Sequence, residues 1–126
     1  MHNRIISVPM TARFWLNVEG DWVKMALRSD GETVEIKEGG RTEEGYDRTT
    51  TTIWRDEDLV YLRAERNARD CDGFTSSDYL YVCHVCDLNK CLPYSEDSAP
   101  QPGARLPEWR EVRSEHRDCF AEAMGY

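Results

Sequence analysis

Cysteine and histidine residues form the most suggestive chemical pattern in this sequence. A Cys-x-x-Cys pair lies near residue 85 and a His-x-x-Cys pair near residue 117. Together they offer four soft or borderline ligands, the number that a tetrahedral zinc ion takes. The ligands predicted by this pattern are Cys83, Cys86, His116 and Cys119, with Cys71 and Cys91 as substitutes. A zinc-stabilised protein-interaction module is therefore one alternative for this chain.

The same residues have a simpler interpretation as buried thiols. Cys83 and Cys86 fall at the end of an expected strand, where residues three apart point to opposite faces. The 29 residues between the two pairs also exceed the usual spacing of zinc fingers. Because free cysteine is among the most buried residue types, packing explains these positions without a metal. His116 is then a hydrogen-bonded core histidine.

Catalytic patterns carry less weight. A Cys–His nucleophile needs an accessible thiolate beside a base, whereas Cys119 and His116 share an expected packed stripe. Paired carboxylates such as Glu43 and Glu44 lie in expected turns, whereas an acid–base pair needs one buried carboxyl group. Gly39-Gly40 lacks the Lys-Ser/Thr that follows a phosphate-binding loop. We therefore expect a protein that is not an enzyme and has no cofactor other than the zinc discussed above.

Charge is the feature that points most directly to a partner. The chain carries 16 basic and 24 acidic residues, a net charge of −8, and residues 19–58 hold 12 of the acids against 6 bases. Outward strand residues two apart are about 6.7 Å from each other, so acids on such a face imitate the phosphates of a nucleic acid. The candidate partner-binding residues are Glu19, Asp21, Asp30, Glu32, Glu35, Glu43, Glu44, Asp47, Asp56, Glu57 and Asp58.

A negative surface of this kind attracts a basic protein and repels phosphate. The expected partner is the basic surface of a nucleic-acid-handling complex, with no direct binding to nucleic acid or membrane. The alternative is that the acids serve only solubility. The odd number of cysteines, five, and the lack of a signal peptide or a long apolar run favour reduced thiols in the cytoplasm.

The elements that must position these residues are mostly strands. Apolar residues alternate with polar ones over 13–18, 22–27, 33–38 and 59–67, and residues 49–54 are β-branched. Residues 79–86 are apolar on both faces, which indicates a central strand. A further edge strand is expected over 4–8, a tight hairpin at Asp30-Gly31, and a mobile loop over 38–48.

The remainder of the chain predicts a connection and a helix. Residues 87–106 hold three prolines without periodicity and read as an irregular connection. From Pro107 to residue 124, apolar residues recur every three or four positions, as on one face of a helix. We expect one α+β domain over residues 1–126: a β-rich part of five to seven antiparallel strands (1–86), the connection (87–106), and a C-terminal helix (107–124) packed on the sheet.

In size, acidity and lack of a catalytic motif, the chain resembles small acidic proteins of phages and mobile elements, including anti-CRISPR and other anti-defence inhibitors. Some of those proteins imitate DNA and occupy a basic groove. The resemblance implies a non-catalytic, stoichiometric inhibitor, and it transfers no residue roles because no motif is shared. This inhibitor is the leading functional prediction from the sequence, and the zinc module is the alternative.

Overall fold

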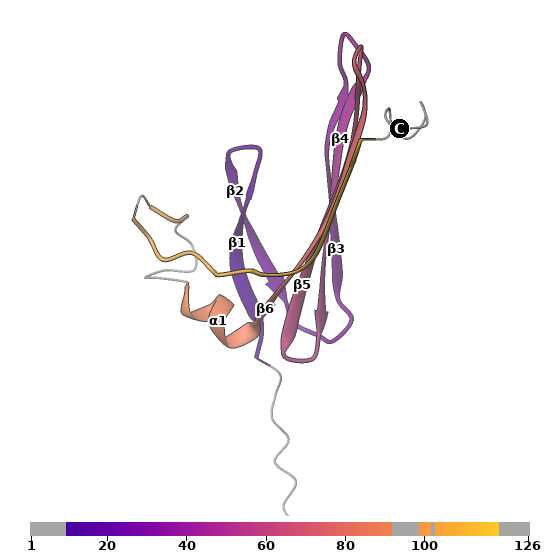
Figure 1. Cartoon of the computed structure of the whole chain (residues 1–126). Coiled ribbons are helices and arrows are strands. Elements are labelled where there is room, and N and C mark those ends of the chain that lie inside the picture. The colour runs from indigo at the N-terminus through magenta and orange to yellow at the C-terminus, as the bar shows by residue number, and fades with distance from the viewer. Residues whose placement is uncertain (1–9, 92–98, 102, 119–126) are drawn as a thin grey trace, which may run out of the picture.

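The computed structural model describes residues 10–91, 99–101 and 103–118, which form seven strands and one short helix (Figure 1). In chain order they are β1 (Ala12–Val18), β2 (Asp21–Leu27), β3 (Thr33–Arg41), β4 (Tyr46–Asp56), β5 (Leu59–Asp70), β6 (Gly73–His84), α1 (Val85–Lys90) and β7 (Arg110–Asp118). All strand pairs are antiparallel. The predicted α+β class with an antiparallel sheet is confirmed.

The strands divide into two sheets. The order β3-β4-β5-β6-β7 is a five-stranded meander in which each strand pairs with the next along the chain, and β1-β2 is a separate hairpin. The long strands of the meander rise well above the hairpin and α1 (Figure 1). At about 3.3 Å per residue, the 11 residues of β4 span roughly 33 Å.

The hydrophobic core occupies only one end of the five-stranded sheet. Hairpin β1-β2 and α1 pack against the sheet there, and the largest fully buried side chains are Phe14, Leu27, Ile53, Val60 and Leu88. We call residues 33–36, 51–64 and 79–84 the proximal half of the sheet, and residues 37–50 and 65–78 the distal half. No residue of the distal half is buried. The expected inward positions Val60 and Leu62 are confirmed as part of the core.

A buried arginine joins the two sheets at the proximal end. Arg55 is 3% exposed, and its guanidinium donates to four backbone carbonyls, those of Met10, Leu27, Arg28 and Glu57. Its backbone also bonds to the β2–β3 connection, with Arg55 N donating to the Glu32 carbonyl. Arg55 therefore fixes the start of β1 and the end of β2 against the β4–β5 turn.

The helix predicted over 107–124 is wrong where the structure describes that segment. Residues 110–118 form strand β7, which pairs with β6, and residues 119–124 lie outside the described part. Strand β6 would otherwise leave a row of backbone donors and acceptors at an edge, and pairing satisfies them. The helical spacing is partly accidental, because Val112 is 50% exposed while Trp109 packs edge-on against Phe14. The helix that does form, α1, occupies the start of the expected irregular connection.

Two smaller expectations also differ from the structure. The loop expected over 38–48 is mostly strand, because β3 runs to Arg41 and β4 begins at Tyr46. Asp30-Gly31 does not close a tight hairpin, since β2 and β3 belong to different sheets. Instead the Asp30 carboxylate accepts from Glu57 N across the junction. The strand expected over 4–8 lies outside the described residues.

Among the described residues, no helix is long and apolar enough to cross a membrane. The longest described helix, α1, has six residues.

Candidate functional site

The structure does not bring the predicted zinc ligands together. Residue His116 pairs with Ser77 in the sheet, whereas Cys83 pairs with Val60, six positions or about 20 Å further along β6. Cys71 lies beyond the opposite end of β6, and Cys119 lies outside the described residues. Within the described part of the chain, no group of three or more metal-ligating side chains is placed to hold an ion.

The cysteines near α1 behave as packing residues. Cys83 and Cys91 are buried, and burial raises the pKa of the Cys83 thiol to about 11. Burial likewise raises the pKa of Cys91. Both thiols therefore stay protonated near neutral pH, which disfavours them as nucleophiles. Cys86 is exposed, and its backbone N–H bonds to the His84 ring at the N-cap of α1.

The predicted partner-binding acids do not lie on one surface. Asp30, Glu32, Asp56, Glu57 and Asp58 gather at the proximal end, in the β2–β3 connection and the β4–β5 turn. Glu43 and Glu44 lie beyond the distal end of the sheet, in the β3–β4 turn. Glu19 and Asp21 are at the tip of the β1-β2 hairpin. A single array over all these residues is therefore excluded by the length of the sheet.

Several of these acids have internal partners. The backbone N–H groups of Arg28 and Ser29 donate to the Glu32 carboxylate and lower its pKa. Glu35 pairs with Lys37 at 3.4 Å on β3. Arg66 binds Asp47 through two hydrogen bonds of 3.0 and 2.8 Å, which lowers the pKa of that carboxyl group. The carboxylates of Glu32, Glu35 and Asp47 therefore already have partners within this chain.

The distal end carries a compact group of acids on two neighbouring turns. We call Glu43, Glu44, Asp70 and Asp72 the acidic tip. The β3–β4 turn is closed by backbone hydrogen bonds between Thr42 and Gly45. A Cβ on Gly45 would lie 2.2 Å from the Arg69 carbonyl, so glycine permits close approach of β5 to this turn.

The Cys71 thiol lies beside the carboxylates of the acidic tip, and its pKa reflects their negative charge. The Cys71 sulfur lies 3.5 Å from the Glu44 carboxylate and is exposed. Its pKa is raised, first by the hydrogen bond to Glu44 and then by the charge of Asp72, with a smaller contribution from Asp70. Carboxylates from two turns that lie about 27 residues apart in sequence therefore all raise the pKa of this one thiol. The sequence alone does not connect Asp70 and Asp72 with Glu44, because the two turns are far apart in the chain.

The two faces of the five-stranded sheet differ in charge. Residues directly opposite each other in an antiparallel sheet share a face, as do residues two apart in a strand. The face opposite the core, which we call the outer face, has seven basic and four acidic residues among the described side chains, a net charge of +3 by register. They are Lys37, Arg41, Arg48, Arg63, Arg69, Arg110 and Arg113, with Glu35, Asp56, Glu65 and Asp78.

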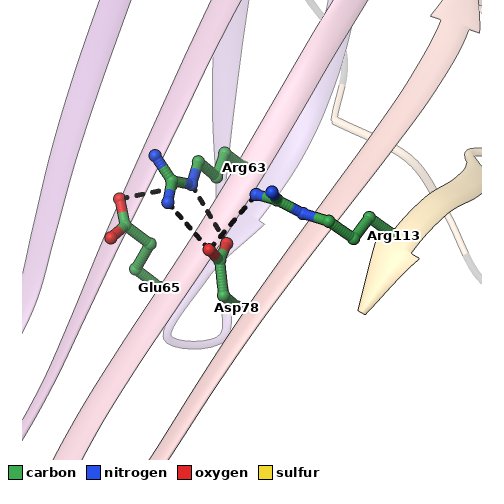
Figure 2. Close-up of polar contacts among 4 residues, drawn as sticks. All are labelled: Arg63, Glu65, Asp78 and Arg113. Atoms are coloured by element: carbon green, nitrogen blue, oxygen red, sulfur yellow. Dashed lines mark hydrogen bonds and ion pairs between the residues drawn. The ribbon is translucent and has the colours of Figure 1, made fainter. Parts of the chain in front are cut away.

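An ion-pair network occupies the middle of the outer face. Figure 2 shows Asp78 of β6 between Arg63 of β5 and Arg113 of β7, with Glu65 on the other side of Arg63. Arg63 holds Asp78 by two hydrogen bonds of 3.0 and 2.7 Å, and this contact lowers the pKa of the Asp78 carboxyl group. The network joins three neighbouring strands and balances its own charges.

Beyond this network lies a cluster of arginines and aromatic rings that sequence reasoning missed. Tyr46 and Arg69 are directly opposite each other on β4 and β5, and Arg69 is opposite Phe74 of β6. Arg48 lies 5.2 Å from the Tyr46 ring centroid, and Arg69 lies 4.8 Å from that of Phe74. We call Tyr46, Arg48, Arg69 and Phe74 the basic–aromatic patch. The two-residue spacing of Tyr46 and Arg48 signals a shared strand face, but this segment was expected to begin in a loop.

An open groove of about 380 Å³ lies on the opposite, core-facing side of the distal half. Glu19 of the β1-β2 turn lines it together with Glu38, Asp47, Thr49 and Arg66 of the sheet. Asp47 and Arg66 of this lining bind each other, so the groove has a polar lining of both charges.

Comparison with known proteins does not identify a family. No protein-family model matches the chain, and the searches of curated proteins and of solved structures gave no match.

Proposed function

We propose that this chain is a non-catalytic binding protein that docks its acidic tip onto a basic, nucleic-acid-handling protein and acts as a stoichiometric inhibitor of it. The observation that supports this proposal is the convergence of Glu43, Glu44, Asp70 and Asp72 on two neighbouring turns. In this proposal the partner contacts the acidic tip rather than the whole set of acids expected from the sequence.

The position of the tip suits insertion into a groove. It lies at the far end of strands that rise away from the core, as the ribbon in Figure 1 shows. Within the described residues, the four carboxylates of the tip have no ion pair to a basic side chain. Asp70 accepts a hydrogen bond from Asp72 N and Glu44 accepts one from the Cys71 thiol, but both contacts are local to the tip and do not join the two sheets. The charge of the tip is therefore not neutralised by these contacts and can pair with lysines and arginines of a partner, where close charge pairs accelerate association.

The proximal acids support this function less well. Asp30 and Glu32 accept backbone hydrogen bonds that hold the junction between the two sheets. A partner that engaged them would compete with those bonds. Asp56 and Asp58 are exposed and serve better as a control surface.

The test compares two charge reversals of equal size. The tip variant is Glu43→Lys/Glu44→Lys and the control is Asp56→Lys/Asp58→Lys, so both raise the net charge by the same amount. Partners are captured from an extract of the native host with each protein, and the captured partner is then tested for binding to labelled DNA or RNA with and without this chain. We expect the wild type and the control to be captured and to compete, and the tip variant to bind at least tenfold more weakly.

Salt provides a second measurement. Because the contact is made by exposed charges, affinity for the captured partner should fall steeply between about 50 and 200 mM salt. Equal affinities of the tip and control variants, or an affinity that does not change with salt, would contradict the proposal.

A further inference from the structure

The basic–aromatic patch has charges that the rest of the sheet does not need. Arg63, Arg66 and Arg113 each bind an acidic side chain. In contrast, Arg48 and Arg69 make no ion pair within the described residues, and each lies over an aromatic ring. Both arginines are exposed in the distal half, where no core packing requires them. Their contacts with the rings support the sheet, but no acidic side chain within the described residues neutralises their charge.

Arginine stacked on an aromatic ring is suited to one ligand class. The guanidinium presents a flat cationic plane on which a nucleobase can stack, and its N–H groups donate to phosphate oxygens. The half-buried rings of Tyr46 and Phe74 add stacking surface at opposite ends of one row across β4, β5 and β6. Asn67, directly opposite Arg48, adds a polar side chain beside the row. We propose that the basic–aromatic patch binds single-stranded nucleic acid.

The shape of the sheet favours a single strand over a duplex. Five strands at about 4.8 Å spacing make a face about 19 Å wide, which exceeds the roughly 12 Å width of the DNA major groove. Rings on such a face cannot reach bases that are stacked inside a helix. The exposed bases of a single strand can lie flat on them.

The net charge of −8 does not prevent this binding. At physiological salt, charges separated by more than about 8 Å are largely screened, so the local charge of the face determines contact with phosphate. The acidic tip borders the patch at the end of the sheet and repels phosphate there. A bound strand should therefore run from Arg69 past Arg48 and along the outer face, away from the tip.

This inference does not depend on the proposed function. The tip and the patch use different residues, and loss of one leaves the other intact. The total charge of the sequence predicts no direct contact with nucleic acid, whereas the charge of each sheet face depends on the tertiary structure.

Fluorescence anisotropy with a labelled oligothymidylate and a labelled oligouridylate tests the proposal. Arg48→Gln/Arg69→Gln should weaken binding at least tenfold at low salt. The same double variant should lower the slope of log affinity against log salt by about 1.4, since each phosphate contact of a single strand contributes about 0.7. The matched control is Arg28→Gln/Lys90→Gln, which removes two exposed positive charges from the proximal end and should bind as the wild type does.

A further variant separates stacking from charge. Phe74→Leu keeps an apolar side chain and leaves both arginines in place, yet should weaken binding about tenfold because the ring that supports Arg69 is lost. Thermal melting of every variant checks that the sheet is intact. If Arg48→Gln/Arg69→Gln melts well below the wild type, it is replaced by Arg48→Lys/Arg69→Lys, which keeps the charge and loses the planar stack.

Three outcomes would overturn the proposal. The first is equal binding by the double variant and its control, and the second is binding to a matched duplex as tight as to the single strand. The third is wild-type self-association in sedimentation that the patch substitution abolishes without any binding to oligonucleotide. That last result would assign the patch to the acidic tip of a second copy of this chain.

Discussion

The proximal and distal halves of the five-stranded sheet share the same strands and hydrogen-bonding register but differ in what stabilises them. In the proximal half, Ile53 and Val60 are fully buried against the hairpin and the helix. In the distal half no residue is buried, and cross-strand contacts such as Arg66–Asp47 and Arg69–Phe74 take over. A β-sheet that is anchored to a hydrophobic core at one end can therefore extend well beyond that core.

Because of this difference, core packing does not restrict which residue types can occupy the distal half. A buried position must be apolar and must fit its neighbours, whereas an uncovered strand needs only compatible cross-strand pairs. Both candidate binding features, the acidic tip and the basic–aromatic patch, therefore lie in the distal half or at its end. Stability and recognition are largely divided between the two halves, and four pairs of substitutions test or sharpen that division.

Truncation of a core phenylalanine at the proximal end should have the largest effect. Phe14→Ala removes a ring that is 1% exposed and leaves a cavity beside Trp109, which should cost about 3–5 kcal/mol of the free energy of unfolding. The matched distal change, Phe74→Ala, removes a half-buried ring and its contact with Arg69 and should cost about 1 kcal/mol. Urea unfolding followed by tryptophan fluorescence measures both, and equal losses would refute the division.

Removal of a buried guanidinium should have the next largest effect. Arg55→Lys cannot reach all four carbonyls to which Arg55 now donates, and each buried acceptor left unpaired costs about 1–3 kcal/mol. We expect a total loss of about 2–4 kcal/mol, with partial relief from bound water. The distal counterpart, Arg66→Lys, changes an exposed ion pair and should cost less than about 1 kcal/mol. Thermal melting distinguishes these results.

Two neighbouring glycines provide a test within the distal half alone. Gly39 has a φ of +85°, and an added Cβ would lie 2.0 Å from the Asp47 carbonyl oxygen, whereas Gly40 has open space at the same position. Gly39→Ala should cost about 1–3 kcal/mol and Gly40→Ala close to nothing. Hydrogen exchange of the β3 and β4 amides measures the local effect. A Gly39→Ala variant whose β3 and β4 amides exchange as slowly as in the wild type would show that these strands accept the added Cβ without strain.

The smallest expected effect concerns the Asp78 network and pH. The Arg63 hydrogen bonds lower the folded-state pKa of Asp78, so the carboxylate stabilises the fold above its unfolded pKa of about 3.9. That stabilisation should be lost as pH falls below about 4 and through the folded pKa. Asp78→Asn should cost about 0.5–1 kcal/mol at neutral pH and flatten this part of the pH profile.

Urea unfolding at several pH values checks this prediction. Asp47→Asn is the control, because its pair with Arg66 is more exposed and should contribute less. An Asp78→Asn variant with the wild-type pH profile would show that the network in Figure 2 adds no stability.

Much of the sheet was predictable because local sequence specifies it. The alternation expected over 22–27 and 59–67 matches the observed burial of Met25, Leu27, Val60 and Leu62, although Val23, expected on the same face, is 38% exposed. The wrong helix over 107–124 shows the opposite case. Its spacing is compatible with a helix, but the choice depended on whether strand β6 offered an edge, and that edge is made by distant residues.

The candidate sites were predictable only in part. Glu43 and Glu44 were expected to contact a partner, but their neighbours Asp70 and Asp72 join them only through the register of β4 and β5. The basic–aromatic patch depends on the same register, since no local spacing links Tyr46 to Arg69. The net charges of sequence segments also do not indicate that one face of the sheet is net basic.

By itself, the sequence determined where strands alternate, where turns interrupt them and how acidic the chain is, because these properties depend on residues a few positions apart. Only the tertiary structure decided that 110–118 pairs as β7, that the core stops at mid-sheet, and which charges share a face. Those outcomes depend on backbone pairing between segments that lie far apart in the chain, and one register fixes the faces of many side chains at once.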